Sequence, residues 1–168
     1  MRNFVFLKFI IITNFVLGCD VSKPEVLLSQ ARSAASSPGG LVKAAGLFEE
    51  FLQQYPEHNL APIALKESAA VAQQRGSFLD ALDIYNRLMS EFPTSEHCDE
   101  AQFMVAFIYE EYLQDYSQAR EAYKLLIERY PDSELVASAR HLLPHVGRNP
   151  EDWIHFETDD AERGGKAK

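Results

Sequence analysis

The sequence has 168 residues, a formal net charge of -9, and 46% hydrophobic and 24% charged residues. These proportions are typical of a globular chain that buries a core, and the length allows one domain with short appendages. A negative surface repels phosphate backbones, so the composition argues against nucleic-acid binding. We expect no disulfide between the two cysteines, Cys19 and Cys98, because it would tie the N-terminal segment to the middle of the domain.

The chain begins with an export-signal pattern. Residues 1–19 read MRNFVFLKFIIITNFVLGC, in which Arg2 and Lys8 accompany an apolar run over residues 9–17. The run is shorter than the roughly 20 apolar residues that span a bilayer, which favours a removed signal over a transmembrane helix. We therefore expect residues 1–18 to be a signal peptide.

The end of this segment, V-L-G-C, resembles a bacterial lipobox, although Leu17 is bulkier than the usual residue. The resemblance implies cleavage before Cys19, lipid attachment to its thiol, and a lipidated tether over residues 19–23. Several acyl chains on one cysteine make membrane attachment effectively stable. An ordinary cleaved signal and an uncleaved anchor are the alternatives, and Asp20 leaves the choice between inner and outer membrane open.

A repeating helical pattern follows the tether. Shifts of 38 and then 37 residues superimpose three sets of apolar residues, each closed by a proline. These sets are Tyr116, Ala119, Tyr123, Leu126 and Pro131; Phe78, Ala81, Tyr85, Leu88 and Pro93; and Leu41, Ala44, Phe48, Phe51 and Pro56. Periods of this length mark helix-turn-helix units that bury their apolar faces against their neighbours.

The spacing of apolar residues at i, i+3, i+4 and i+7 predicts an all-α fold, an α-α superhelix of about three helix pairs plus a capping helix. This helical domain covers residues 24–143. Its predicted helices span residues 24–35, 41–55, 62–74, 78–92, 96–113, 116–130 and 134–143. A proline disfavours helical backbone in the residue before it, so the closing prolines end the second helix of each pair.

Helix starts are predicted from capping residues. Ser77 with Asp80 three residues later resembles a capping box, and Asp115 precedes the helix predicted over residues 116–130. Asn59 is expected to cap the helix predicted over residues 62–74.

Residues 144–168 form the predicted tail. The sequence N-P-E-D that starts at Asn149 predicts one short helix, and the end of the tail is expected to be disordered. Trp153, Ile154 and Phe156 either pack back on the helices or bind a partner. We expect packing, because large aromatic residues usually bury against their own chain.

The repeated unit resembles the tetratricopeptide repeat (TPR), in which an alanine and an aromatic residue in the second helix and a closing proline recur. The matching residues are Ala44, Phe48 and Pro56; Ala81, Tyr85 and Pro93; and Ala119, Tyr123 and Pro131. Ala69 and Ala106 stand where the family prefers glycine, and the period exceeds the usual 34 or so residues. The resemblance covers residues 41–143.

The longer units resemble an envelope subfamily of these repeats. It contains the BamD-like lipoprotein of the β-barrel assembly machinery, whose domain has about five repeats, and the C-terminal repeats of the Tol-Pal-associated coordinator of envelope division. The resemblance implies a membrane-anchored scaffold for protein-protein interaction in the bacterial cell envelope. The lipid anchor would hold it in the outer membrane facing the periplasm, with outer-membrane protein assembly as a role. The alternative that it implies is a soluble periplasmic adaptor that oligomerises.

The sequence contains no pattern of catalytic or cofactor-binding residues. His141 and His145 have a spacing at which two imidazoles could share zinc, but Pro144 lies between them and no glutamate follows His141. Neither a glycine-rich phosphate loop nor a nucleophile elbow is found. We therefore predict no enzyme activity, no cofactor and no metal.

The resemblance places the binding surface on the concave face, which the first helices of such a stack line. Alignment of the units puts six candidates there, namely Lys66, Gln73, Phe103, Phe107, Glu110 and Glu111. The two phenylalanines would anchor a helix or an extended peptide, and the glutamates would select a basic partner. The alternative is that both phenylalanines pack between helices and the acids are solvated. The expected partners are envelope proteins of unknown identity.

Overall fold

The computed structural model of the chain describes residues 23–149. Within that range it contains seven α-helices, one π-helix and one 3-10 helix, and no strand. This confirms the predicted all-α fold. The predicted export signal, the lipidation of Cys19 and the short helix with Trp153 lie outside the described residues.

The helices follow one another with short connections. They are α1 (Pro24–Ala35), α2 (Leu41–Gln54), α3 (Ala61–Gln74), α4 (Phe78–Glu91), α5 (Cys98–Phe107), α6 (Tyr116–Arg129) and α7 (Leu135–Leu142). The π-helix (Ile108–Tyr112) continues α5, and the 3-10 helix (Leu143–His145) continues α7. When each pair of joined segments is counted as one helix, the helices start and end within two residues of the predicted ranges.

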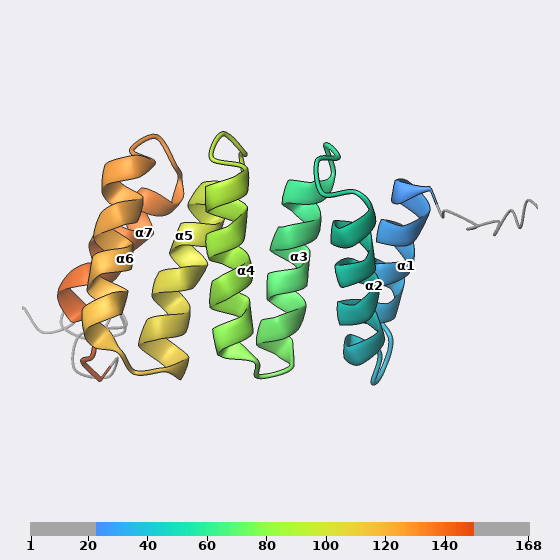
Figure 1. Cartoon of the computed structure of the whole chain (residues 1–168). Helices are drawn as coiled ribbons and strands as arrows, with labels where there is room; N and C mark the ends of the chain where they lie inside the picture. The colour runs from blue at the N-terminus through green and yellow to red at the C-terminus, as the bar shows by residue number, and fades with distance from the viewer. Residues whose placement is uncertain (1–22, 150–168) are drawn as a thin grey trace, which may run out of the picture.

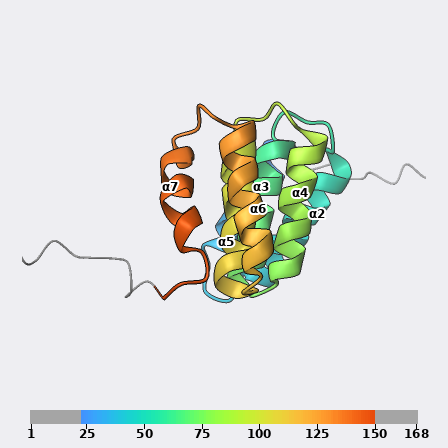
Figure 2. The same ribbon diagram turned by 90° about the vertical axis from the view of Figure 1, so that its left-hand side faces the viewer.

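The helices form a stack of pairs. Helices α1 and α2, α3 and α4, and α5 and α6 pack as pairs, while α2 contacts α3 and α4 contacts α5 between pairs. Figure 1 shows the helices side by side from α1 to α7, and Figure 2 shows α2 and α4 on one side of the stack and α7 on the other. This is the expected TPR-like superhelix, with α7 covering the open end of the last pair.

The core lies between the helices and uses the repeated positions found in the sequence. In α2, α4 and α6, the repeated alanines, the aromatic residues four positions later and the apolar residues three positions beyond these are all buried. They are Ala44, Phe48 and Phe51; Ala81, Tyr85 and Leu88; and Ala119, Tyr123 and Leu126. Ala69 in α3 and Ala106 in α5 have no exposed surface either. Alanine at these positions lets the helices approach closely, so a larger side chain would force them apart.

The residue before each closing proline ends its helix in the same way. Tyr55, Phe92 and Tyr130 have φ between -128° and -132° and ψ between 53° and 59°, outside the helical region. Steric contact with the proline ring disfavours helical backbone there. The predicted role of the three prolines is therefore confirmed.

The predicted helix caps are only partly present. Asp115 caps α6 as predicted, because its Oδ1 accepts a hydrogen bond from the backbone N–H of Gln118 at 3.1 Å. The predicted capping box at Ser77 is wrong, since the Ser77 side chain makes no capping bond. The Ser77 backbone N–H instead donates to the carbonyl of Ala72, which closes the turn after α3. A serine oxygen also reaches one bond less far than an aspartate oxygen.

The predicted cap at Asn59 is also wrong. Leu60 occupies the position before α3, and its backbone N–H donates to Nδ1 of His58 at 3.2 Å. The histidine therefore bonds the residue before the helix, and no side-chain hydrogen bond caps α3.

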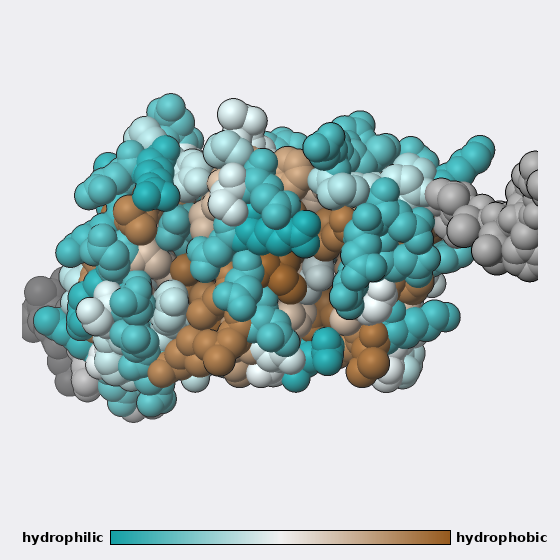
Figure 3. Space-filling model, viewed as in Figure 1, coloured by the Kyte–Doolittle hydropathy of each residue, from teal (hydrophilic) through white to brown (hydrophobic). Residues whose placement is uncertain are grey.

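The outer face of the stack is mostly polar, with local apolar exposure. Figure 3 shows apolar side chains gathered over the lower half of the face that includes α4. Val42 in α2 and Leu79 in α4 are 71% and 67% exposed. Among the helices between residues 23 and 149, none combines the length and the hydrophobicity needed to cross a membrane.

Candidate functional site

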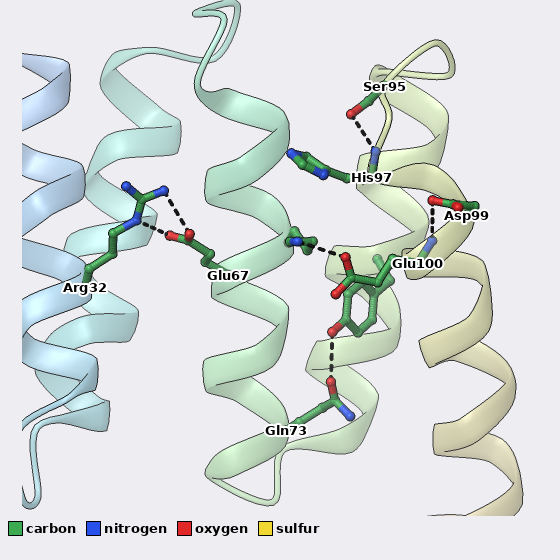
Figure 4. Close-up of polar contacts among 9 residues, drawn as sticks. Arg32, Glu67, Gln73, Ser95, His97, Asp99 and Glu100 are labelled. Carbon is green, nitrogen blue, oxygen red and sulfur yellow. Dashed lines mark hydrogen bonds and ion pairs between the residues drawn. The ribbon is translucent and has the colours of Figure 1, made fainter. Parts of the chain in front are cut away.

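The six candidate residues divide into two sets of three. Lys66 belongs to the first set, whose members make contacts within the stack. Its Nζ lies 2.8 Å from Oε2 of Glu100, so the pair joins α3 to α5. A similar pair joins α1 to α3, where the Arg32 guanidinium binds both carboxylate oxygens of Glu67 at 2.7 and 2.8 Å (Figure 4). These pairs bridge consecutive repeats along the face of the first helices.

Gln73 and Phe103 complete the first set. The Tyr85 hydroxyl donates to Oε1 of Gln73 at 2.8 Å, which satisfies a phenol that is buried between the helices. Burial also raises the Tyr85 pKa, with a smaller contribution from the Glu100 charge. Phe103 packs against the core and makes an edge-on contact with Tyr123, with ring centroids 5.6 Å apart. These two side chains support the core of the stack.

Phe107, Glu110 and Glu111 form the second set and line one cleft. The cleft has a volume of about 440 Å³ and lies at the C-terminal end of the stack. The π-helix supplies its two glutamates, α6 supplies Tyr116, and the other wall runs from Leu142 to Asn149. The sequence alignment identified one side of this cleft and missed the other.

The π-helix explains how both glutamates reach the cleft. A π-turn holds one residue more than an α-helical turn, which rotates the following side chains about the helix axis. The N–H of Leu113 donates to the carbonyl of Ile108, and that of Asp115 donates to the carbonyl of Tyr109. Gln114, which also lines the cleft, has a φ of 54°. Left-handed backbone is unfavourable for most residues with a side chain, and Gln114 adopts it where the chain leaves the π-helix.

The opposite wall is fixed to α6. Nη2 of Arg120 donates to the carbonyl of Val146 at 2.7 Å, and the Val146 side chain is buried. Gly147 has a φ of 79°, and a Cβ at this position would lie 2.9 Å from the ring of Tyr116. Only glycine fits here, because both its backbone conformation and the close tyrosine ring exclude a side chain.

Glu110 connects the two sides of the cleft electrostatically. Its Oε2 accepts a hydrogen bond from the Tyr123 hydroxyl at 3.0 Å. Burial raises the Glu110 pKa, and the neighbouring charge of Glu111 adds to this effect. The Tyr123 bond, hydrogen bonding from the Gly147 backbone and the Arg120 charge oppose the rise. A partly desolvated carboxylate is therefore held in the cleft, where a cation from a ligand would stabilise it.

The described residues offer little for covalent or metal chemistry. No group of three or more histidine, cysteine or acidic side chains could hold a metal within residues 23–149. The rings of His141 and His145 have centroids 5.9 Å apart. Cys98 is buried, and its thiol donates to the carbonyl of Phe92 at 3.1 Å. Burial raises its pKa, which keeps the thiol protonated.

The comparisons with known proteins place one repeat in a family. Residues 100–133, which cover most of α5, the π-helix and α6, match the family model described as a tetratricopeptide repeat. No match was found among curated proteins. Repeats of this family generally mediate protein-protein interactions, and their all-α fold is typically non-catalytic. The matched repeat and the helix pairs packed in series together support a TPR protein.

Proposed function

We propose that this protein is a lipid-anchored interaction scaffold of the bacterial cell envelope, and that a protein partner binds in the cleft at the C-terminal end of its stack. The observation that carries the binding site is the meeting of Phe107, Glu110 and Glu111 in one cavity of about 440 Å³. The anchor is supported by the export-signal pattern and by Cys19 after a lipobox-like sequence.

The chemistry of the cleft supports a partner that carries an apolar anchor beside a cation. Phe107 is half-buried, and its ring contacts Tyr112 edge-on with centroids 5.8 Å apart. Glu110 and Glu111 place two carboxylates beside it, and the guanidinium of Arg148 lines the same cleft. An apolar anchor next to a lysine or arginine would fit, because the anchor buries on the phenylalanine while the cation meets the glutamates. The resemblance to the BamD-like lipoproteins makes a component of outer-membrane protein assembly the partner that we propose.

The anchor is tested by fractionating cells that express the full chain or the Cys19→Ala variant. The full chain should sediment with membranes, and the variant should lose this association because no thiol is left to carry lipid. Density separation of the membranes then distinguishes the inner from the outer membrane. A Cys19→Ala chain that stays with membranes would contradict lipid anchoring.

The binding site is tested by affinity purification from detergent-solubilised membranes. The full chain should capture a defined envelope protein, and Phe107→Ala should lose it. Val42→Ala is the matched control, since Val42 is exposed on α2 at the other end of the stack. If both variants capture the same proteins as the full chain, the cleft is not the partner site.

A soluble adaptor that oligomerises is the second candidate. It is supported by the exposed side chain of Leu79 and by the stacked rings of Phe78 and Tyr112, whose centroids lie 4.0 Å apart. Exposed apolar groups of this kind favour association when they form a patch. This candidate predicts a cleaved soluble form whose sedimentation mass rises with concentration, and Leu79→Asp should lower that mass. A concentration-independent monomer would exclude it.

A further inference from the structure

The cleft lies where the described part of the chain ends. Arg148 and Asn149 form part of its wall, and the sequence continues from there as P-E-D-W-I-H-F-E. We propose that this continuation binds in the cleft of its own chain, with Trp153 against Phe107, and that it competes there with the protein partner. The competition rests on the proposed function, whereas the intramolecular binding does not.

The distance along the chain allows this contact. Four residues lead from Asn149 to Trp153, and an extended chain spans at most about 3.6 Å per residue, or about 14 Å in total. Asn149 itself lines the cavity of about 440 Å³. The indole can therefore reach the cleft without any displacement of the helices.

The residues that lead into this segment are held in place. The Arg120–Val146 hydrogen bond and the packing of Gly147 on Tyr116 fix the backbone that forms the cleft wall. The N–H of Arg148 donates to the carbonyl of His145 at 2.8 Å, which turns the chain at the edge of the cleft. A short tether raises the effective concentration of an attached ligand to about the millimolar range, so even weak contacts suffice for binding.

The side chains are complementary. The cleft offers the rings of Phe107 and Tyr116 and the aliphatic side chain of Leu142. Aromatic side chains pack favourably on such rings in edge-on or offset arrangements. The continuation supplies its apolar side chains in one short run, namely Trp153, Ile154 and Phe156.

The charges specify which side of the continuation enters the cleft. Glu110 and Glu111 would repel Glu151 and Asp152, while Arg148 at the edge would attract them. The apolar residues then face the cavity, and the acids face Arg148 and the solvent. An acidic substitution among the apolar residues should therefore release the segment.

The test uses the fluorescence of the full chain, because Trp153 is its only tryptophan. In the native chain, we expect emission at a shorter wavelength than in denaturant and quenching by acrylamide that is several-fold weaker. Phe107→Ala should shift the emission toward longer wavelength and restore strong quenching. Val42→Ala, at the opposite end of the stack, should leave both unchanged.

A second variant keeps the test valid if Phe107→Ala loses helix content by circular dichroism. Ile154→Asp changes the continuation and leaves the helix stack intact, and it should also expose Trp153. If tail and partner compete, Ile154→Asp should in addition capture more partner than the full chain does.

Three results would overturn the proposal. The first is equal quenching of Trp153 by acrylamide in the native and the denatured chain. The second is protection of Trp153 from acrylamide that remains in both Phe107→Ala and Ile154→Asp. The third is protection that disappears on dilution, which would indicate binding between copies. The two proposals fail separately. If Trp153 is exposed and partner capture depends on Phe107, only the intramolecular binding is overturned. If Trp153 is protected and no variant captures a partner, only the partner site is overturned.

Discussion

The Tyr123 hydroxyl donates to the Glu110 carboxylate at 3.0 Å, and one repeat earlier the Tyr85 hydroxyl donates to the Gln73 amide oxygen at 2.8 Å. The two tyrosines occupy equivalent positions in α6 and α4. Their partners lie 13 and 12 residues before them, and the π-helix accounts for the additional residue. The buried tyrosine at this position therefore has an amide partner in the repeat of α4 and a carboxylate partner in the repeat of α6, at the cleft.

The first prediction concerns the charge of Glu110. Burial raises its pKa above the ordinary value of 4.5, so the folded chain binds the proton more tightly than the unfolded chain does. The tighter proton binding stabilises the folded chain fully below pH 4.5. This stabilisation is lost as the pH rises through the pKa of Glu110 in the folded state. Glu110→Gln keeps an acceptor for Tyr123 and removes the titration. The stability of the variant relative to the wild type should therefore increase with pH across this range.

Urea unfolding of both chains on either side of pH 4.5 measures this difference. Val42→Ala is the control, because Val42 is exposed on α2 and carries no titratable group. A stability difference between Glu110→Gln and wild type that does not change with pH would contradict the burial of the Glu110 charge.

The second prediction compares the two tyrosines. A hydrogen bond to a neutral group contributes about 0.5–1.5 kcal/mol to stability and one to a charged group about 1.5–3 kcal/mol. Tyr123→Phe should therefore destabilise the chain more than Tyr85→Phe at neutral pH, although partial exposure of Glu110 reduces the difference. In acid, where Glu110 is protonated, the two losses should converge. Equal losses at neutral pH would show that the carboxylate is screened by solvent.

The sequence predicted the helices well because their signals are local. The residues before Pro56, Pro93 and Pro131 are restricted by the next residue in the chain, and the apolar spacing is set by the geometry of a single helix. The π-helix has no comparable local marker. Its trace in the sequence is the step from a 37-residue to a 38-residue period, which indicates one additional residue without showing where it lies.

The candidate site was harder to predict because it depends on contacts between repeats. Alignment of the units places Lys66 and Phe107 on first helices, but it does not show that Lys66 pairs with Glu100 of the next repeat. The second wall of the cleft is formed by the last residue of α7 and by residues that follow this helix and belong to no repeat. The positive φ of Gly147 and its contact with Tyr116 appear only in three dimensions.

The third prediction concerns helix capping. Asp115 accepts a hydrogen bond from the N–H of Gln118, whereas the side chain of Ser77 makes no such bond at the equivalent start of α4. Loss of a capping side chain costs about 0.5–2 kcal/mol. Asp115→Ala should therefore lower the free energy of unfolding by about 1 kcal/mol, and Ser77→Ala should lower it by less than half of that. Chemical denaturation of the two variants decides this, and equal losses would mean that Ser77 also caps α4 in solution.

The fourth prediction concerns the reactivity of Cys98. The side chain has no exposed surface, and its thiol donates to the carbonyl of Phe92. Burial raises its pKa, and hydrogen bonds with the Ser95 backbone and the Tyr130 side chain oppose this rise. Alkylating reagents attack the thiolate, so both the low thiolate fraction and the closed packing should slow the reaction. The native chain should be alkylated at Cys98 only through transient opening of the structure.

Measurement requires the Cys19→Ala background, in which Cys98 is the one remaining cysteine. Mass spectrometry after iodoacetamide treatment should show modification many-fold slower in the native chain than in denaturant, where the thiol titrates near its usual pKa of about 8.5. Increasing urea below the unfolding transition should accelerate the native reaction, because opening then becomes more frequent. If Cys98 is alkylated as fast in the native chain as in denaturant, the junction between Phe92 and α5 is open in solution. The second repeat would then not be packed on the third.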